Sequence, residues 1–452
     1  MHEPPTAPRF DGDPEGLART PTEADRAAPH PLYCIWELTL RCDLACRHCG
    51  SRAGKGRAAE LSTEACLAIV EQLAEVGVRE VTLLGGEAYL RTDWPTIARA
   101  ISERGMICGL LSGGRNLTAE RVGQAADAGV RTICISLDGL ARTHDAQRGV
   151  AGSFRAALAA CENVVRRGLS LVNNTQLNRL SAPELPALGQ LLARLGSTGW
   201  QVQLSVPMGH AADRPAFLLQ PYELLELFPL LAWVKQRILT PAGVSLFPGN
   251  NVGYFGPFEA ALRYGGERGA HWTGCQAGEW VLGIEADGTV KGCSSLPSES
   301  YGKGSLSTAR LATLLAETPG FAALARRGRE SLSGFCRDCY YAEICRGGCC
   351  WTAHCFLGAP GNNPYCIHRA LELESRGLRE RVVRVAPPPG RPFDHGRFEL
   401  VVEPAEDSSG EPRIEPRAPS IAGFPLDDAL ALTPESPGAW PAETLEAWLG
   451  II

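Results

Sequence analysis

The chain has 452 residues, which is enough for about two or three domains with a sizeable core. Its 44 basic and 50 acidic side chains give a net charge of −6, so it lacks the basic field that general binding to nucleic acid or an anionic membrane requires. The N-terminus lacks the basic and apolar regions of a signal peptide, and no apolar run reaches the length of a membrane span. These features predict a cytoplasmic protein with no nucleic-acid or membrane partner.

Both ends of the chain are rich in proline. Residues 1–32 and 387–452 share this bias, and the second segment is also acidic. Such a composition disfavours a packed core. We therefore predict a disordered N-terminal segment over 1–32 and a tail over 387–452. The tail has one candidate edge strand near Phe398, and we assign neither end a catalytic role.

Residues 33–215 alternate between short apolar runs and amphipathic segments. The runs are rich in β-branched residues and begin near Tyr33, Val78, Met106, Arg131, Leu169 and Trp200. Strands that alternate with helices predict an α/β fold with a parallel sheet and right-handed crossovers. Six units rather than eight predict an open, partial barrel. In such a sheet functional groups gather at the carboxyl ends of the strands.

A cysteine triplet follows the first predicted strand. Cys42, Cys46 and Cys49 form the pattern C-x3-C-x2-C, in a chain of 17 cysteines without an export signal. In a reducing compartment clustered thiols are more readily metal ligands than disulfides. Structural zinc takes four ligands, whereas three thiolates can hold three irons of a cubane and leave the fourth iron open. The triplet therefore favours an iron–sulfur cluster with an open position.

This triplet resembles that of the radical S-adenosylmethionine (SAM) enzymes, and GGEAYLR at 85–91 resembles their GGE motif. The resemblance covers about residues 33–215 and implies a partial (β/α)6 TIM-like barrel. It also implies that SAM chelates the fourth iron of a 4Fe–4S cluster, which cleaves SAM reductively to a 5′-deoxyadenosyl radical. The protein then supplies binding, orientation and exclusion of side reactions.

The same resemblance implies contacts between six residues and SAM. It implies that SAM closely approaches Gly85 and Gly86 and that its ammonium contacts Glu87. It also implies that the SAM ribose contacts Ser136, the carboxylate contacts Arg148 and the adenine contacts His48. A guanidinium suits a carboxylate because it can bind both oxygens. Two alternatives stay open: a surface ion pair for Arg148 and a satisfied strand-end hydroxyl for Ser136.

A second cysteine group occupies residues 271–386. Cys275 and Cys293 bracket an apparent hairpin with Gly288 in its turn, and Cys336, Cys339, Cys345, Cys349 and Cys366 follow. Seven cysteines exceed one tetrahedral zinc site and suit two centres. The pattern is similar to the SPASM extension of peptide-modifying radical SAM enzymes, a small cysteine-rich domain with a hairpin and short helices.

The SPASM resemblance divides these seven cysteines between two auxiliary 4Fe–4S clusters. It implies that the first cluster is held by Cys275, Cys293 and Cys349, and the second by Cys336, Cys339, Cys345 and Cys366. With the cluster at the first triplet, the total is three.

One departure from the SPASM pattern concerns the first auxiliary cluster. The segment before Cys275 lacks the further cysteine that is often present there, so this cluster has an open iron or is capped by His271, Cys350 or Cys355. We favour the open iron, which could bind a substrate thiolate. A second departure is Ser294, where the otherwise similar anaerobic sulfatase-maturating enzymes carry a proposed aspartate base. Serine lacks that basicity, which disfavours formylglycine formation.

Residues 216–270 connect the two regions. The segment 222–239 has the pattern of an amphipathic helix whose aromatic residues pack in the core. The following loop is rich in glycine, asparagine and aromatic residues, and Asn250 and Tyr254 are weak candidates for substrate contact there. The alternative is a plain turn.

Together these patterns predict a radical SAM enzyme with SAM and three 4Fe–4S clusters. We expect it to act on a peptide or protein side chain, by oxidative crosslinking (thioether or C–C) in ribosomal peptide maturation. Its electron donor would be a flavodoxin or ferredoxin. The first alternative is a radical SAM oxidase or dehydratase for a small molecule such as a sugar or cofactor precursor. The second is an iron–sulfur carrier or zinc-stabilised module, which has no need of the GGE motif.

Overall fold

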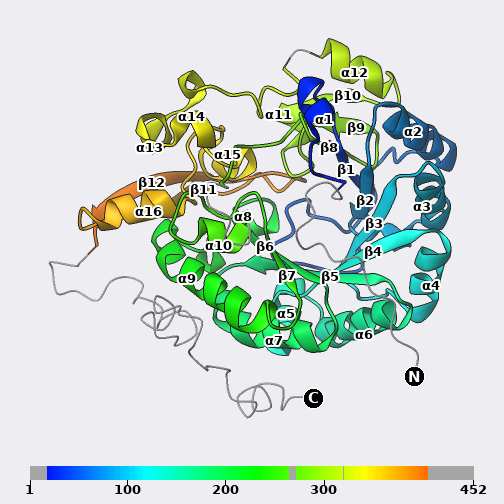
Figure 1. The fold of residues 1–452 in the computed structure, drawn as a ribbon, viewed down its shortest axis with the longest axis horizontal. Helices are drawn as coiled ribbons and strands as arrows, with labels where there is room; N and C mark the ends of the chain where they lie inside the picture. Colours follow the sequence, from blue (N-terminus) through cyan, green and yellow to red (C-terminus); the bar gives the residue numbers. More distant parts are fainter. Residues whose placement is uncertain (1–17, 264–270, 319, 406–452) are drawn as a thin grey trace.

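The computed structural model describes residues 18–263, 271–318 and 320–405, and its main element is a ten-stranded sheet with the order β10-β9-β8-β1-β2-β3-β4-β5-β6-β7 (Figure 1). The strands are β1 Tyr33–Thr39, β2 Glu80–Gly85, β3 Ile107–Ser112, β4 Val130–Ser136, β5 Ser170–Leu177, β6 Gly199–Leu204, β7 Ser245–Pro248, β8 Val281–Ile284, β9 Thr289–Lys291 and β10 Gly302–Ser305. All pairs from β1 to β7 are parallel, and β8 is also parallel to β1.

The predicted α/β fold is confirmed, and its parallel sheet extends beyond the six expected barrel strands to a seventh, β7. Strands β1 to β6 lie where the six apolar runs predicted them, and β8 and β9 form the predicted antiparallel hairpin. The seventh strand, β7, lies in the segment that we expected only to connect two domains. It has four residues and ends at Pro248, so it carried little strand pattern. The pairing of β8 with β1 joins the cysteine-rich region to the barrel in one sheet.

Helices cover the outer side of the curved sheet (Figure 1). Those between β1 and β6 are α2 Thr63–Glu75, α3 Trp94–Glu103, α4 Ala119–Asp127, α5 Ala141–Arg148, α6 Ser153–Arg166 and α7 Leu185–Arg194. The others are α1 Glu23–Ala27, α8 His210–Asp213, α9 Leu224–Val234, α10 Glu259–Arg263, α11 Ser298–Tyr301, α12 Leu311–Glu317, α13 Gly334–Asp338, α14 Ala342–Cys345, α15 Cys350–Leu357 and α16 Ile367–Glu374. The core between sheet and helices includes the fully buried Trp36 and Trp200.

The predicted helix over 222–239 is confirmed as α9 and its continuation Lys235–Leu239. The stretch Pro215–Leu239 is the one candidate membrane span by length and composition in the described residues, and 72% of its apolar window is buried within the structure. This burial is that of a core helix.

Parts of both proline-rich ends are folded, which corrects the sequence prediction. Asp25 of α1 is buried and paired with Arg79 at 2.7 Å. Near the other end, the candidate edge strand near Phe398 is confirmed as β12 (Arg397–Pro404). It pairs with β11 (Leu378–Ala386) in a separate antiparallel sheet, so the tail begins later than residue 387. These residues are folded because they contact residues that are distant in the chain. Amino-acid composition contains no information about such contacts. The rest of both segments, 1–17 and 406–452, lies outside the described residues.

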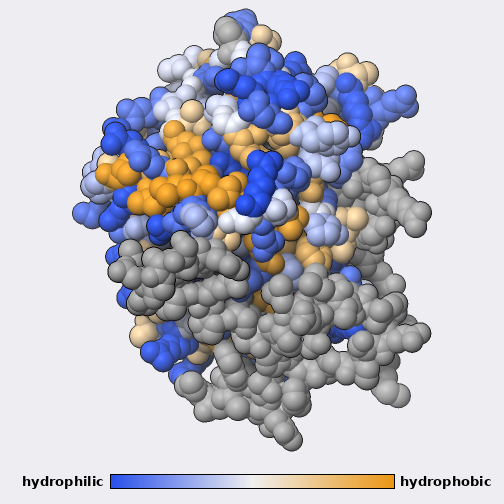
Figure 2. Space-filling model, turned by 90° about the vertical axis from the view of Figure 1, so that its left-hand side faces the viewer, coloured by the Kyte–Doolittle hydropathy of each residue, from blue (hydrophilic) through white to orange (hydrophobic). Residues whose placement is uncertain are grey.

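The β11–β12 sheet lies at the left of the molecule in Figure 1. Its inner side is packed, with Val382 and Phe398 buried. Its outer side carries the exposed valines Val385 and Val401, and Figure 2 shows an apolar surface on this face of the molecule. One side of this sheet is therefore in the core and the other is open.

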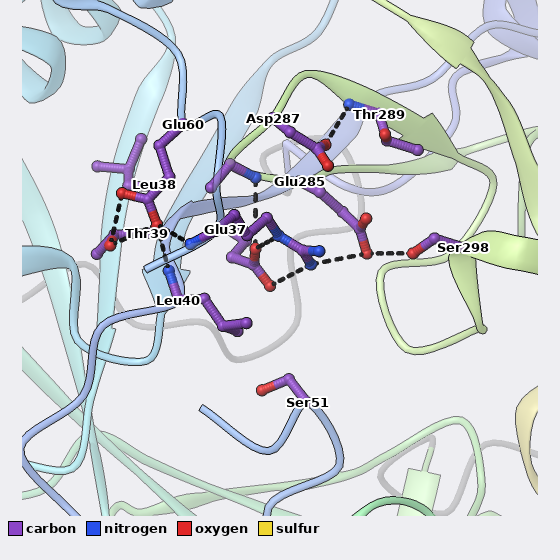
Figure 3. A network of polar contacts seen from close by, with 12 residues as sticks. Glu37, Leu38, Thr39, Leu40, Ser51, Glu60, Glu285, Asp287, Thr289 and Ser298 are labelled. Carbon is purple, nitrogen blue, oxygen red and sulfur yellow. Dashed lines mark hydrogen bonds and ion pairs between the residues drawn. The ribbon is translucent and has the colours of Figure 1, made fainter. Parts of the chain in front are cut away.

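A buried charge network ties β1 to the β8–β9 hairpin (Figure 3). Arg57 donates to Glu37 of β1 at 2.6 Å and lies 3.3 Å from Glu285, which follows β8. Lys291 of β9 also donates to Glu285, at 2.7 Å. Burial raises the pKa of the Glu37 carboxyl, and Arg57 opposes that shift. The network is stable as a set because each buried charge has a partner of opposite sign.

We predict that Arg57→Ala lowers the free energy of unfolding by about 3–5 kcal/mol, because it leaves Glu37 and Glu285 buried with less positive charge beside them. Denaturant unfolding measures this change. The control is Arg310→Ala, which removes the exposed pair with Glu75 and should cost under about 1 kcal/mol. Equal losses in the two variants would contradict the prediction.

Candidate functional site

The cysteine triplet lies on a loop that begins where β1 ends. Backbone hydrogen bonds close this loop on itself: Cys42 N donates to Gly54 O at 3.2 Å, and Gly54 N donates to Leu40 O at 2.9 Å. Within it, Cys49 N donates to Cys46 O at 3.3 Å. All three thiols are partly exposed. The structure thus presents Cys42, Cys46 and Cys49 together at the carboxyl end of the sheet, as the sequence predicted.

Each of the three sulfurs accepts a hydrogen bond from nitrogen. The donors are Leu44 N to Cys42 Sγ at 3.4 Å, Ala53 N to Cys49 Sγ at 3.3 Å and Arg148 Nη1 to Cys46 Sγ at 3.6 Å. Hydrogen bonds to thiolate sulfur stabilise its negative charge and tune a cluster bound to it. The loop therefore has the surroundings that an anionic iron–sulfur cluster requires.

Burial opposes ionisation of two of these thiols while no metal is bound. It raises the pKa of Cys42 well above its usual range and that of Cys46 to about 11. Iron binding must therefore displace protons, as it does at other thiolate sites. The ligand atoms of Cys42, Asp43 and Glu87 lie within 4.8 Å of one another, so a cation fits at this end of the loop.

Glu87 is buried at the end of β2. Its carboxylate accepts from Ser112 Oγ and from Gly113 N, both at 2.6 Å. Burial raises its pKa to about 7 despite these two donors. The ionised carboxylate is the form that can accept from an ammonium, and a positive charge beside it would offset the cost of its burial. That contact with SAM stays a prediction.

Gly85 and Gly86 have a role that the sequence did not indicate. A Cβ on Gly85 would lie 2.1 Å from Thr39 O, and one on Gly86 would lie 2.1 Å from Arg41 O. The backbones are bonded here, since Gly86 N donates to Thr39 O at 2.9 Å. The glycines allow the cysteine loop to approach β2, a close approach of protein to protein that holds whether or not SAM also lies nearby.

Arg148 and His48 share a buried carboxylate. Asp138 Oδ2 lies 2.7 Å from Arg148 Nη2 and 3.2 Å from His48 Nε2. Burial opposes ionisation of Asp138, but Arg148 lowers its pKa overall, and burial lowers the pKa of His48 to about 4. Both terminal nitrogens of Arg148 thus have partners, Asp138 and Cys46. The ion pair of Arg148 with Asp138 is buried rather than on the surface, and the contact of Arg148 with the SAM carboxylate stays a prediction.

Asp138 is a buried carboxylate of this site that the sequence analysis did not single out. It lies two residues after Ser136, just beyond the end of β4, where a carboxylate in a parallel sheet suggests a site residue. Its partners Arg148 and His48 come from other elements. Ser136 is buried and paired in register with Asn174 of β5, at the same edge of the sheet. Its contact with the SAM ribose stays a prediction.

The segment after β11 holds the cysteine loop from the opposite side. Phe393 N donates to Gly50 O at 3.1 Å, and Arg52 Nε donates to Asp394 at 2.9 Å. Arg52 also pairs with Asp213 of α8 at 2.7 Å. Residues 390–396, expected to belong to a tail, therefore help to position the triplet.

The structure brings the later cysteines together in two groups. In the first group, burial raises the pKa of Cys349, and the nearby thiols of Cys275 and Cys293 raise it further. In the second group, burial raises the pKa of Cys345, and the nearby thiols of Cys366, Cys336 and Cys339 add to that shift. These are the two sets that the sequence pattern implied. In the second group, Asn363 N donates to Cys336 Sγ and Tyr341 N to Cys339 Sγ, both at 3.4 Å.

Tyr254 packs within the protein beside the first of these groups, and its substrate contact stays a prediction. Its ring is buried against Trp272, with centroids 4.8 Å apart. Its hydroxyl donates to Asn250 O and accepts from Cys349 N at 3.0 Å. Both hydrogen bonds of this buried hydroxyl are made within the protein, and the one from Cys349 N holds the Cys349 backbone in place. Asn250 itself is exposed, and its substrate contact stays a prediction.

Comparisons with known proteins agree with this geometry. Residues 36–177 match the Radical SAM superfamily. The chain is 31% identical over 397 residues to the mycofactocin maturase MftC of Mycolicibacterium smegmatis, covering 84% of this chain and 92% of the relative. The chain belongs to the radical SAM superfamily. This radical SAM protein is an enzyme with a SAM-binding, iron–sulfur fold.

Two further relatives and one solved structure are similar to this radical SAM enzyme. It is 28% identical over 349 residues to a PqqA peptide cyclase of Ruegeria pomeroyi, covering 76% of this chain and 88% of the relative. It is 27% identical over 359 residues to an AdoMet-dependent heme synthase of Oleidesulfovibrio alaskensis, covering 75% and 87%. The crystal structure of Streptococcus suis SuiB bound to S-adenosylmethionine has a TM-score of 0.59 at 18% identity, covering 75% and 76%, and shares the fold.

We predict that the cluster-free protein loses stability as pH rises from about 4.5 to 7, in part through Glu87. Its raised pKa means that the folded state keeps a proton that the unfolded chain releases in this window. The contribution is present below pH 4.5 and amounts to about 3 kcal/mol lost by pH 7 and above. Urea unfolding across this range should give a flatter profile for Glu87→Gln. Glu71→Gln on the exposed surface should keep the wild-type slope, and the same flattening in both variants would refute the assignment.

Proposed function

We propose that this enzyme modifies a side chain of a peptide or protein, with SAM and three 4Fe–4S clusters as cofactors. The observation that carries the proposal is the presence of three separate cysteine groups on one sheet-linked body. The first lies at the carboxyl end of β1, the second includes the two cysteines that bracket the β8–β9 hairpin, and the third lies beyond the hairpin in sequence. Two relatives also support it, one named a maturase and one a peptide cyclase.

Cys42, Cys46 and Cys49 would hold the first cluster, which supplies reductive cleavage of SAM to a 5′-deoxyadenosyl radical. The protein's own share is positioning. Glu87 would accept from the SAM ammonium, because its buried carboxylate lies beside Cys42 at the edge of this loop. Arg148 would position the cluster ligand Cys46, because its guanidinium contacts both Cys46 Sγ and the Asp138 carboxylate.

The two auxiliary groups favour a net oxidation of the substrate, since further clusters can carry away the electron that remains after hydrogen abstraction. Oxidative crosslinking, thioether or C–C, is the reaction class of this proposal, and a flavodoxin or ferredoxin is the proposed electron donor. Ser294 stands where a sulfatase-maturating enzyme would carry its aspartate, so formylglycine formation is disfavoured.

A second candidate is oxidation of a small cofactor precursor. The similarity to a heme synthase over 75% of the chain favours it. The two candidates differ in substrate rather than in the first step, so both require SAM cleavage.

Anaerobic reconstitution tests the shared part of both candidates. We expect about twelve irons per chain, since three cubanes hold that number, and 5′-deoxyadenosine that depends on a reductant. Replacing Cys42, Cys46 and Cys49 together by alanine should abolish SAM cleavage and lower the iron content to about eight. The matched control is Cys108→Ala, a buried strand thiol outside all three groups. Continued SAM cleavage by the triple variant would overturn the proposal.

Mass spectrometry then separates the two substrates. The peptide candidate predicts a loss of hydrogen mass from a co-expressed precursor peptide, located to one side chain by fragmentation and absent with the triple variant. The cofactor candidate predicts an unchanged peptide and conversion of a tetrapyrrole precursor instead. An unmodified peptide together with a converted precursor would reverse our order of preference.

A further inference from the structure

We propose that Cys350 is the fourth sulfur ligand of the first auxiliary cluster, beside Cys275, Cys293 and Cys349. The inference rests on the proposed function, which puts a cluster at these three cysteines. It replaces the sequence expectation of an open iron. Four thiolates leave no vacant position for an outside ligand.

Cys350 lies next to the other three ligands. It follows Cys349 directly as the first residue of α15, and it is 1% exposed. Its backbone N–H and its thiol both hydrogen-bond to the sulfur of Cys275. The sulfurs of Cys275 and Cys350 are therefore neighbours, although the two residues are far apart in sequence.

A buried arginine identifies Cys350 as the site of a negative charge. The Arg327 side chain is buried and its Nη1 donates to Cys350 Sγ. Its other contacts are with the carbonyl oxygens of Arg346 and Gly348. Within the described residues no carboxylate pairs with Arg327. A buried guanidinium without a carboxylate needs another anion, and a thiolate held by iron supplies one.

The first cysteine triplet contains the same arrangement. There the buried Arg148 donates to Cys46 Sγ, and Cys46 is one of the three cysteines of the radical SAM motif. Arg148 also has Asp138 as a partner, whereas Arg327 has only sulfur and carbonyl oxygen within the described residues. The case for an anionic sulfur is therefore stronger at Cys350 than at Cys46.

The sequence left two other caps open. Cys355 is fully buried further along α15, and it also lies near Cys349 and Cys293. His271 directs Nδ1 to Trp272 O at 3.0 Å, and its ring lies 5.8 Å from Phe255. Phe255 stacks on Tyr341, which adjoins Cys339 of the second auxiliary group. Neither residue has the charged neighbour that Cys350 has.

Labelled cyanide tests this inference, because an iron with an exchangeable position binds cyanide and an iron held by four cysteines does not. The protein used is the full chain with Cys42, Cys46 and Cys49 replaced by alanine, which leaves only the auxiliary clusters. With Cys350 present, we expect about eight irons and no ¹³C coupling by electron nuclear double resonance. Adding Cys350→Ala should produce ¹³C coupling, or lower the iron content by one to four atoms per chain.

The matched control is Cys355→Ala in the same background, which removes a buried thiol of the same helix and should change neither readout. Cyanide coupling in the protein that retains Cys350 would overturn the inference, and this measurement needs no variant at Cys350. It would also be overturned if Cys355→Ala, and not Cys350→Ala, opened the cluster. Iron near zero in this background would instead refute the three-cluster proposal, and SAM cleavage by the wild type is measured separately.

Discussion

The ion pair of Arg57 with Glu37 and Glu285 is the interaction on which the site depends. Arg57 follows the cysteine loop in sequence, Glu37 lies on β1 and Glu285 follows β8, so one guanidinium connects the loop, the barrel and the hairpin. The parallel pairing of β8 with β1 brings the two carboxylates close enough to share it. Because the network is buried, moving any one part separates charges in a medium of low dielectric constant.

The cysteine loop is held from two sides, and this explains how a segment with little regular structure keeps three thiols in place. On the side of the sheet, Glu60 accepts from Leu40 N at 3.0 Å and from the Thr39 hydroxyl at 2.9 Å (Figure 3). On the other side, Arg52 is bound by Asp394 and Asp213. A metal site needs ligands that are already oriented, since each side chain ordered on binding costs entropy.

A buried arginine contacts a cysteine sulfur at two separate sites of the molecule. Arg148 contacts Cys46 in the barrel, and Arg327 contacts Cys350 beyond the hairpin. Burial alone disfavours thiolates, and a nearby guanidinium or N–H donor offsets that cost. The same side chains would lower the energy of an anionic cluster and influence its potential, so position and electronic tuning come from the same residues.

The sequence by itself determined the strand–helix alternation, the cysteine groups and the superfamily, because periodicity and short spacings are local properties. It placed Glu87 at a strand end correctly, but it could not show that Arg148 is engaged by Asp138, nor that Tyr254 is buried against Cys349. The tertiary structure also decided that part of a proline-rich end is folded. Such contacts join residues that are far apart in the chain, and their partners are defined only once the sheet has closed around them.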